Sequence, residues 1–170
     1  MSFEEAAEGL RRGDFSRLAP LFGDPDHPDE AGGEIVTWLA AGAFADARDV
    51  LNEALTCACW LGQIGVARRL LDAGADPSAG NATGLSALHW AANRGQVPAV
   101  ELLLTAGAQM EQRSMYDATA LDTAVWSAIN EPRGNQLGAI RALLEAGADV
   151  SAVTLPTGRS DIDKLLARYL

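Results

Sequence analysis

The chain has 170 residues, the length of one ordinary domain, and hydrophobic residues make up 48% of it. Acidic residues outnumber basic ones 23 to 13, which gives a formal net charge of -10. Because an acidic surface repels phosphate backbones and anionic lipid headgroups, this charge argues against nucleic acid and membranes as partners. It favours solubility and a partner with a basic surface. Mimicry of DNA is the remaining use of such charge, but no long acidic run lines one predicted face.

Cysteine usage and targeting signals predict a cytoplasmic protein. The two cysteines, Cys57 and Cys59, lie two positions apart on a predicted helix, so their side chains point in different directions. We therefore expect no disulfide and a reducing compartment. The N-terminal segment lacks an apolar core of signal-peptide length, and no apolar run reaches the roughly 18 residues that a membrane span needs. Twelve arginines accompany one lysine, Lys164, which suggests a GC-rich bacterial genome.

The first 50 residues predict helices without a clear repeat. Residues 3–12 and 15–22 predict a helix pair hinged at Gly13 and Asp14, and residues 34–41 predict another short helix. Residues 23–33, rich in Pro, Asp and Gly, predict a loop. Its acidic run lacks the ligand spacing of a calcium loop, so we interpret it as solvated. Residues 1–50 form either a degenerate first repeat or an irregular helical segment that caps the chain from residue 51 onward.

An internal repeat occupies the next two thirds of the chain. Three segments end alike, LLDAGAD, LLTAGAQ and LLEAGAD, and their glycines are Gly74, Gly107 and Gly147. The intervals between these glycines are 33 and 40 residues. Residues 86–96, SALHWAANRGQ, begin 21 residues before the second glycine, and related stretches begin 21 residues before the first and 28 before the third. The third unit therefore carries seven extra residues.

The stretch at residues 86–96 resembles the ankyrin pattern T-P-L-H-x-A-A-x-x-G-H, and the 33-residue period is that of the ankyrin family. The resemblance implies an all-α solenoid of stacked helix-turn-helix units with projecting β-turns. Leu88, Ala91 and Ala92 lie at helical spacing, which predicts an apolar stripe on the first helix of a unit. A single unit cannot bury this stripe alone, so stacking on neighbouring units supplies the core. Three repeats are expected over residues 51–158.

The C-terminal residues 159–170 predict one helix that caps the stack. Ser160 is expected to be its N-cap, with Asp163 three residues later. The apolar side chains of this helix recur at helical spacing, and they are Ile162, Leu165, Leu166 and Tyr169.

Ankyrin arrays bind proteins through the concave face made by their first helices and projecting turns, so the resemblance implies an unidentified protein partner for this chain. The positions carried over on the first helices are Trp60, Asn93 and Trp126 in one column and Leu61, Arg94 and Ser127 in a second. The positions in the turns are Asn81, Ala82, Thr83 and Leu85 in one and Ser114, Met115, Tyr116 and Ala118 in the next. Trp, Tyr and Arg are common in binding hot spots. The alternative is that both tryptophans pack against the N-terminal segment or the insertion.

The seven-residue insertion of the third repeat falls within residues 129–134 and their neighbours, between the two helices. Pro132 and Gly134 predict a loop there. Insertions in repeat proteins often carry function, so Glu131 and Arg133 either contact a partner or pair with the array itself.

No catalytic, cofactor or metal motif is present, so we expect no enzyme, no cofactor and no metal. His89 occupies the histidine of the ankyrin pattern, whose usual role is hydrogen bonding to a neighbouring turn; the third repeat has Asp122 there. We predict a monomeric protein-interaction module. The alternatives are neutralisation of a neighbouring toxin or enzyme, a small-ligand or catalytic pocket between the insertion and the N-terminus, and a purely architectural piece.

Overall fold

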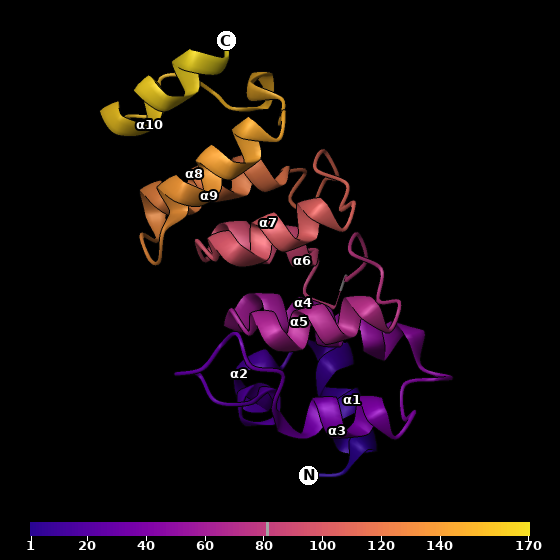
Figure 1. The fold of residues 1–170 in the computed structure, drawn as a ribbon. Coiled ribbons are helices and arrows are strands. Elements are labelled where there is room, and N and C mark those ends of the chain that lie inside the picture. The colour runs from indigo at the N-terminus through magenta and orange to yellow at the C-terminus, as the bar shows by residue number, and fades with distance from the viewer. Residues whose placement is uncertain (81) are drawn as a thin grey trace.

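A computed structural model describes residues 1–80 and 82–170 of the chain. Over these residues it contains ten α-helices, three short 3-10 helices and no strand. Figure 1 shows the helices stacked in pairs along an elongated molecule, with the two termini at opposite ends. The prediction of an all-α solenoid is confirmed. The helices are α1 (Phe3–Arg12), α2 (Phe15–Leu18), η1 (Ala19–Phe22), α3 (Gly33–Ala40), α4 (Arg48–Leu61), α5 (Ile64–Asp72), α6 (Ala87–Asn93), α7 (Val97–Thr105), α8 (Ala120–Asn130), α9 (Gln136–Glu145), η2 (Val150–Ala152), α10 (Ser160–Leu166) and η3 (Ala167–Tyr169).

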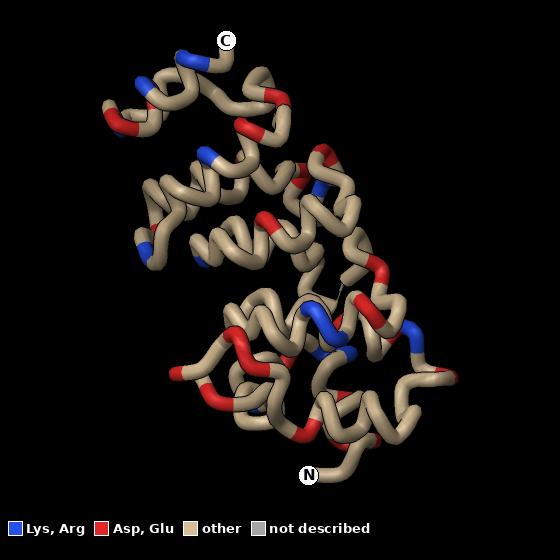
Figure 2. The backbone as a smooth tube through the Cα atoms, in the orientation of Figure 1, with Lys and Arg blue, Asp and Glu red and all other residues tan. Residues whose placement is uncertain are grey.

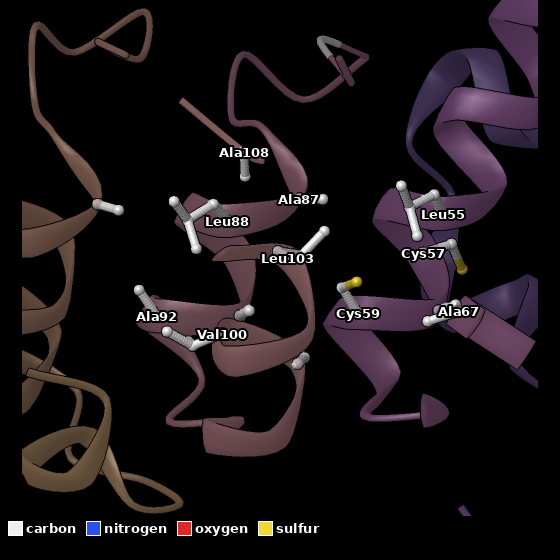
Figure 3. Close-up of a cluster of buried hydrophobic side chains, with 14 of the residues drawn as sticks. Leu55, Cys57, Cys59, Ala67, Ala87, Leu88, Ala92, Val100, Leu103 and Ala108 are labelled. Atoms are coloured by element: carbon white, nitrogen blue, oxygen red, sulfur yellow. The ribbon is translucent and has the colours of Figure 1, made fainter. Parts of the chain in front are cut away.

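Two rows of helices run along the stack. Helices α4, α6 and α8 pack on one another in the first row, and α5, α7 and α9 form the second. Small side chains permit this close packing, since Ala58, Ala91 and Ala124 are fully buried in the first row. Leu88, Val100 and Leu103 lie in the adjoining core of the second pair (Figure 3). The apolar stripe predicted for the first helices is thus confirmed as the contact between repeats.

Caps set the helix boundaries within the repeats. The hydroxyl of Ser86 accepts a hydrogen bond from the backbone N–H of His89 at the start of α6, and Thr119 forms a capping box with Asp122 at the start of α8. Gly95 follows α6 with φ at +65°, and a Cβ there would collide with the backbone of Asn135. Only glycine fits this turn.

The N-terminal helices extend both rows. α1 packs on α4, and α3 packs on α5 and on η1. The predicted helix pair hinged at Gly13 is present, although its second member changes to 3-10 geometry at Ala19. Because α1 and α3 occupy the two positions of a helix pair, we propose that residues 1–50 form a degenerate first repeat with α2 and η1 inserted.

The predicted loop after η1 is present and spans residues 23–32. It lies against the start of α5, where the backbone N–H of Gly65 donates to the carbonyl of Pro28 at 2.9 Å. Within the loop, His27 pairs with Asp24 at 2.8 Å. Among the described residues no group of acidic, His or Cys side chains is arranged to hold a metal ion.

The C-terminal helix α10 packs on α9 and buries Ile162, Leu165 and Leu166. Tyr169 is 40% exposed, so it does not complete that stripe. The prediction that Ser160 caps α10 is wrong, since Ser160 is its first residue and Arg159 is the N-cap. Asp163 instead accepts hydrogen bonds from the backbone N–H and the hydroxyl of Thr157, which closes the turn before the helix.

Candidate functional site

The side chains of α4, α6 and α8 that face away from the second row, together with the turns before α6 and α8, are called here the inner-helix surface. These turns project from one side of the stack (Figure 1). All of the predicted contact residues except those of the insertion belong to these elements, but their exposure differs widely.

Trp60 on α4 is packed within the protein. Its ring lies 6.1 Å from that of Phe15 in α2 and 6.4 Å from that of Trp90 in α6, as centroid distances. The Cζ of Arg94 lies 4.2 Å from the centroid of the Trp60 ring, an arrangement that attracts the cation to the π face. Trp60 is half-buried, and these contacts tie the N-terminal segment to the second helix pair. They support the packing interpretation of Trp60.

Thr83 takes part in the same cluster. Its hydroxyl accepts a 2.7 Å hydrogen bond from the indole N–H of Trp90, which orients that ring. Leu85 and Leu61 are half-buried. The predicted turn residue Asn81 lies outside the described residues.

Trp126 on α8 differs from Trp60, because 53% of it is exposed. One turn later Ile129 is exposed as well. The carbonyl of Trp126 accepts a 2.9 Å hydrogen bond from the side-chain amide of Asn130. Trp126 is thus a large aromatic side chain that α8 leaves available on this surface.

The turn before α8 presents two further large side chains. Met115 is 68% exposed and Tyr116 is 70% exposed. The backbone N–H of Met115 donates to the carbonyl of Gly84 at 3.0 Å, which joins this turn to the preceding one. Asp117 has φ at +58°, a left-handed conformation that reverses the chain after Tyr116.

Two predicted contact residues are inaccessible, and for them the prediction of an exposed side chain is wrong. Ser127 is fully buried, and its hydroxyl donates to the carbonyl of Asn93 at 2.9 Å. Asn93 itself is buried. The amide of Gln136 donates to that same Asn93 carbonyl at 2.8 Å and to the Ser127 hydroxyl at 3.0 Å. Ser127 and Asn93 therefore hold α6, α8 and α9 together rather than face a partner.

The insertion is a folded part of the array. α8 has 11 residues and α6 has seven, so four of the seven extra residues lengthen α8 by about one turn. The rest form a loop in which Arg133 pairs with Glu131. Gln136 anchors this loop, since its amide donates to the Glu131 carbonyl at 3.1 Å and its carbonyl accepts from the Arg133 N–H at 2.9 Å. The sequence singled out the two charged residues and missed Gln136.

Comparison with known proteins decides the family. The family model for ankyrin repeats (3 copies) matches residues 75–154, which contain α6 to α9. Residues 75–154 of this chain are therefore ankyrin repeats. Ankyrin repeats generally serve as protein–protein interaction modules and as scaffolds without catalysis. No curated protein matches the chain in sequence.

The histidine of the ankyrin pattern has the structural role that was predicted. His89 is buried; its Nδ1 is 2.6 Å from the Ser86 hydroxyl and its Nε2 is 2.9 Å from the Ala118 carbonyl in the next turn. Burial is the main cause that lowers the pKa of His89. Asp122, at the same position of the third repeat, instead accepts from the N–H and hydroxyl of Thr119.

The cysteines of the ankyrin array are chemically inert. Cys57 and Cys59 are buried and unbonded to each other. Burial raises the pKa of the Cys59 thiol to about 12, and it raises the pKa of Cys57 strongly as well. Because the thiolate is the nucleophilic form, neither suits covalent catalysis.

A shallow hollow of about 360 Å³ lies between the insertion and α10. It is lined by Pro132, Arg133, Asn135, Arg159 and Ile162, among others. Trp126, His89 and Asp122 do not line it. No helix among the described residues is both long and apolar enough to cross a bilayer.

Proposed function

We propose that this ankyrin-repeat protein binds a partner protein through its inner-helix surface, with Trp126 at the centre of the contact, and that it is not an enzyme. The carrying observation is the exposure of Trp126 on α8 beside a turn that exposes Met115 and Tyr116. Exposure of large apolar side chains to water is unfavourable, so a partner that covers them lowers the free energy of the complex. Arg94 and Leu61 contribute from the half-buried margin of this surface.

An affinity pull-down from lysate of the source organism tests this proposal. Trp126→Ala should remove a partner that the wild-type protein retains, with a loss of roughly 2 kcal/mol or more of binding free energy. Tyr169→Ala removes an exposed aromatic side chain from the C-terminal cap and serves as the matched control. A partner retained equally by wild type and Trp126→Ala would contradict the proposed site and would direct attention to the insertion.

The proposal favours a protein over nucleic acid or a membrane, because the net charge is -10. Figure 2 shows acidic residues distributed along the whole stack rather than gathered into one stripe, which argues against mimicry of DNA. We further propose that the protein is a monomer, since its own N-terminal and C-terminal helices cover the two ends of the repeat stack. Measurement of mass in solution checks this.

A narrower form of the proposal is that the partner is a toxin or an enzyme encoded beside this gene. The excess of acidic residues suits an inhibitor of a basic protein. A toxin-like neighbour in the genome supports this role, and a neighbourhood of unrelated metabolic genes contradicts it.

A further inference from the structure

Arg94 differs from the other arginines of the chain. It lies at the C-cap of α6 and is half-buried, and within the described residues no carboxylate lies at ion-pair distance from it. Arginines such as Arg141, which also lack an ion pair there, are exposed to water. Arg159, which also has intermediate burial, pairs with Asp161. Arg94 is therefore a partly desolvated cation whose charge has no acidic counterpart in the described part of the chain.

The surroundings of Arg94 favour an anion. Burial lowers the pKa of Arg94, and repulsion by Arg133 lowers it further. Its Nε is buried without a hydrogen-bond partner among the described residues. The face of Trp60 offsets part of the desolvation cost, but an aromatic ring supplies less than a carboxylate does. A carboxylate from a partner would form charge-assisted hydrogen bonds with the guanidinium and would offset the repulsion by Arg133.

An exposed apolar side chain, Trp126, lies on the next helix of the first row. The hydrogen bond from the hydroxyl of Ser127 to the carbonyl of Asn93 places the backbone at Trp126 and Ser127 beside the backbone at Asn93 and Arg94. The loop residue Gly134 lies against the carbonyl of Arg94. One short partner segment can therefore meet both a cation and an indole.

We propose that the partner contributes a segment with an Asp or Glu a few residues from a large apolar side chain, the carboxylate pairing with Arg94 and the apolar side chain packing on Trp126. This inference rests on the proposed function and specifies its chemistry. It also departs from the net charge, which alone favours a basic partner. The charge next to Arg94 matters more for the partner than the net charge does. An ion pair at a half-buried site is weakly screened, whereas charges beyond the Debye length contribute little.

The test is selection from a display library of random linear peptides fused through their C-termini, so that only side-chain carboxylates are sampled. The baits are the wild-type protein, Arg94→Glu, Trp126→Ala and the control Arg141→Glu, which changes the net charge equally at an exposed position of α9. Circular dichroism first establishes that each bait is folded. The affinity of the strongest peptides is then measured at low and high salt.

Wild type and Arg141→Glu should enrich acidic-apolar peptides, and Arg94→Glu should weaken their binding about tenfold or more. High salt should weaken the wild-type affinity and leave that of Arg94→Glu nearly unchanged. Peptides that depend on Trp126 but show no acidic preference would overturn this inference and leave the proposed function standing. Failure to enrich any peptide that depends on Trp126 would count against both.

Discussion

At the scale of single residues, equivalent positions of the repeats have different structural roles. Trp60 and Trp126 occupy the same position of two repeats, yet Trp60 packs on Phe15 and Trp90 whereas Trp126 faces solvent. The difference arises from the neighbours, since α1 and η1 of the N-terminal segment pack against α4. Exposure of one tryptophan and packing of the other result from the ends of the array rather than from the repeat pattern.

This difference predicts opposite effects of two matched substitutions. Trp60→Ala should lower the free energy of unfolding by about 2–4 kcal/mol, because it leaves a gap among aromatic rings and removes the contact with Arg94. Trp126→Ala should change it by less than about 0.5 kcal/mol. Urea denaturation of both variants and the wild type measures this. Equal losses in the two variants would show that Trp126 is also a packing residue.

His89 predicts a dependence of stability on pH. Its folded pKa lies below the ordinary value of 6.5, so the unfolded chain takes up a proton first as the pH falls. The contribution of neutral His89 is therefore complete above the ordinary pKa and is lost as the pH falls from there toward the folded pKa. His89→Gln should be less stable at neutral pH and should lose less stability on acidification.

Urea unfolding at pH about 7.5 and about 5.5 measures this effect. His27→Gln is the control, since Asp24 raises the pKa of exposed His27 by a hydrogen bond and its linkage has the opposite sign. The same loss of stability on acidification in His89→Gln as in the wild type would contradict the assignment.

At the scale of elements, the insertion adds a turn to α8 and a loop that one buried side chain holds. Gln136 makes four hydrogen bonds to α6, α8 and the loop, with Asn93, Ser127, Glu131 and Arg133 as partners. Its removal would leave several backbone groups without partners. The insertion is thus a structural extension of the array.

Gln136→Ala should therefore cost about 1–3 kcal/mol and speed amide hydrogen exchange in residues 131–135. Gln96→Ala is the matched control, because Gln96 occupies the equivalent position before α7, where no insertion follows α6. Unchanged exchange in the loop of Gln136→Ala would show that the loop is held by other contacts.

The periodic pattern predicted these elements well where local chemistry decides. Ser86 and Thr119 marked the starts of α6 and α8, and the glycines marked the turns. In the first repeat the stretch equivalent to residues 86–96 begins at residue 53, whereas α4 already begins at Arg48. The burial of Ser127 could not be predicted from the repeat pattern, since it depends on Gln136, nine residues later.

At the scale of the whole molecule, hydrogen bonds between turns and helices join successive repeats. Glu53 accepts from the N–H of Ala82, and His89 lies within hydrogen-bonding distance of Ala118 one repeat later. The turns after the second helices are joined as well, since the N–H of Gln109 donates to the hydroxyl of Ser78 and that of Asp149 donates to the carboxylate of Glu111. Stability of such an array comes from contacts between neighbours, so the binding surface is continuous across repeats.

Hydrogen exchange of the protein with and without its captured partner tests the central proposal most directly. We expect binding to slow amide hydrogen exchange in α6, in α8 around Trp126 and in the turn that carries Met115 and Tyr116. Exchange in α7 and α9 should not change. Protection confined to α7 and α9, or to the hollow beside α10, would contradict binding through the inner-helix surface.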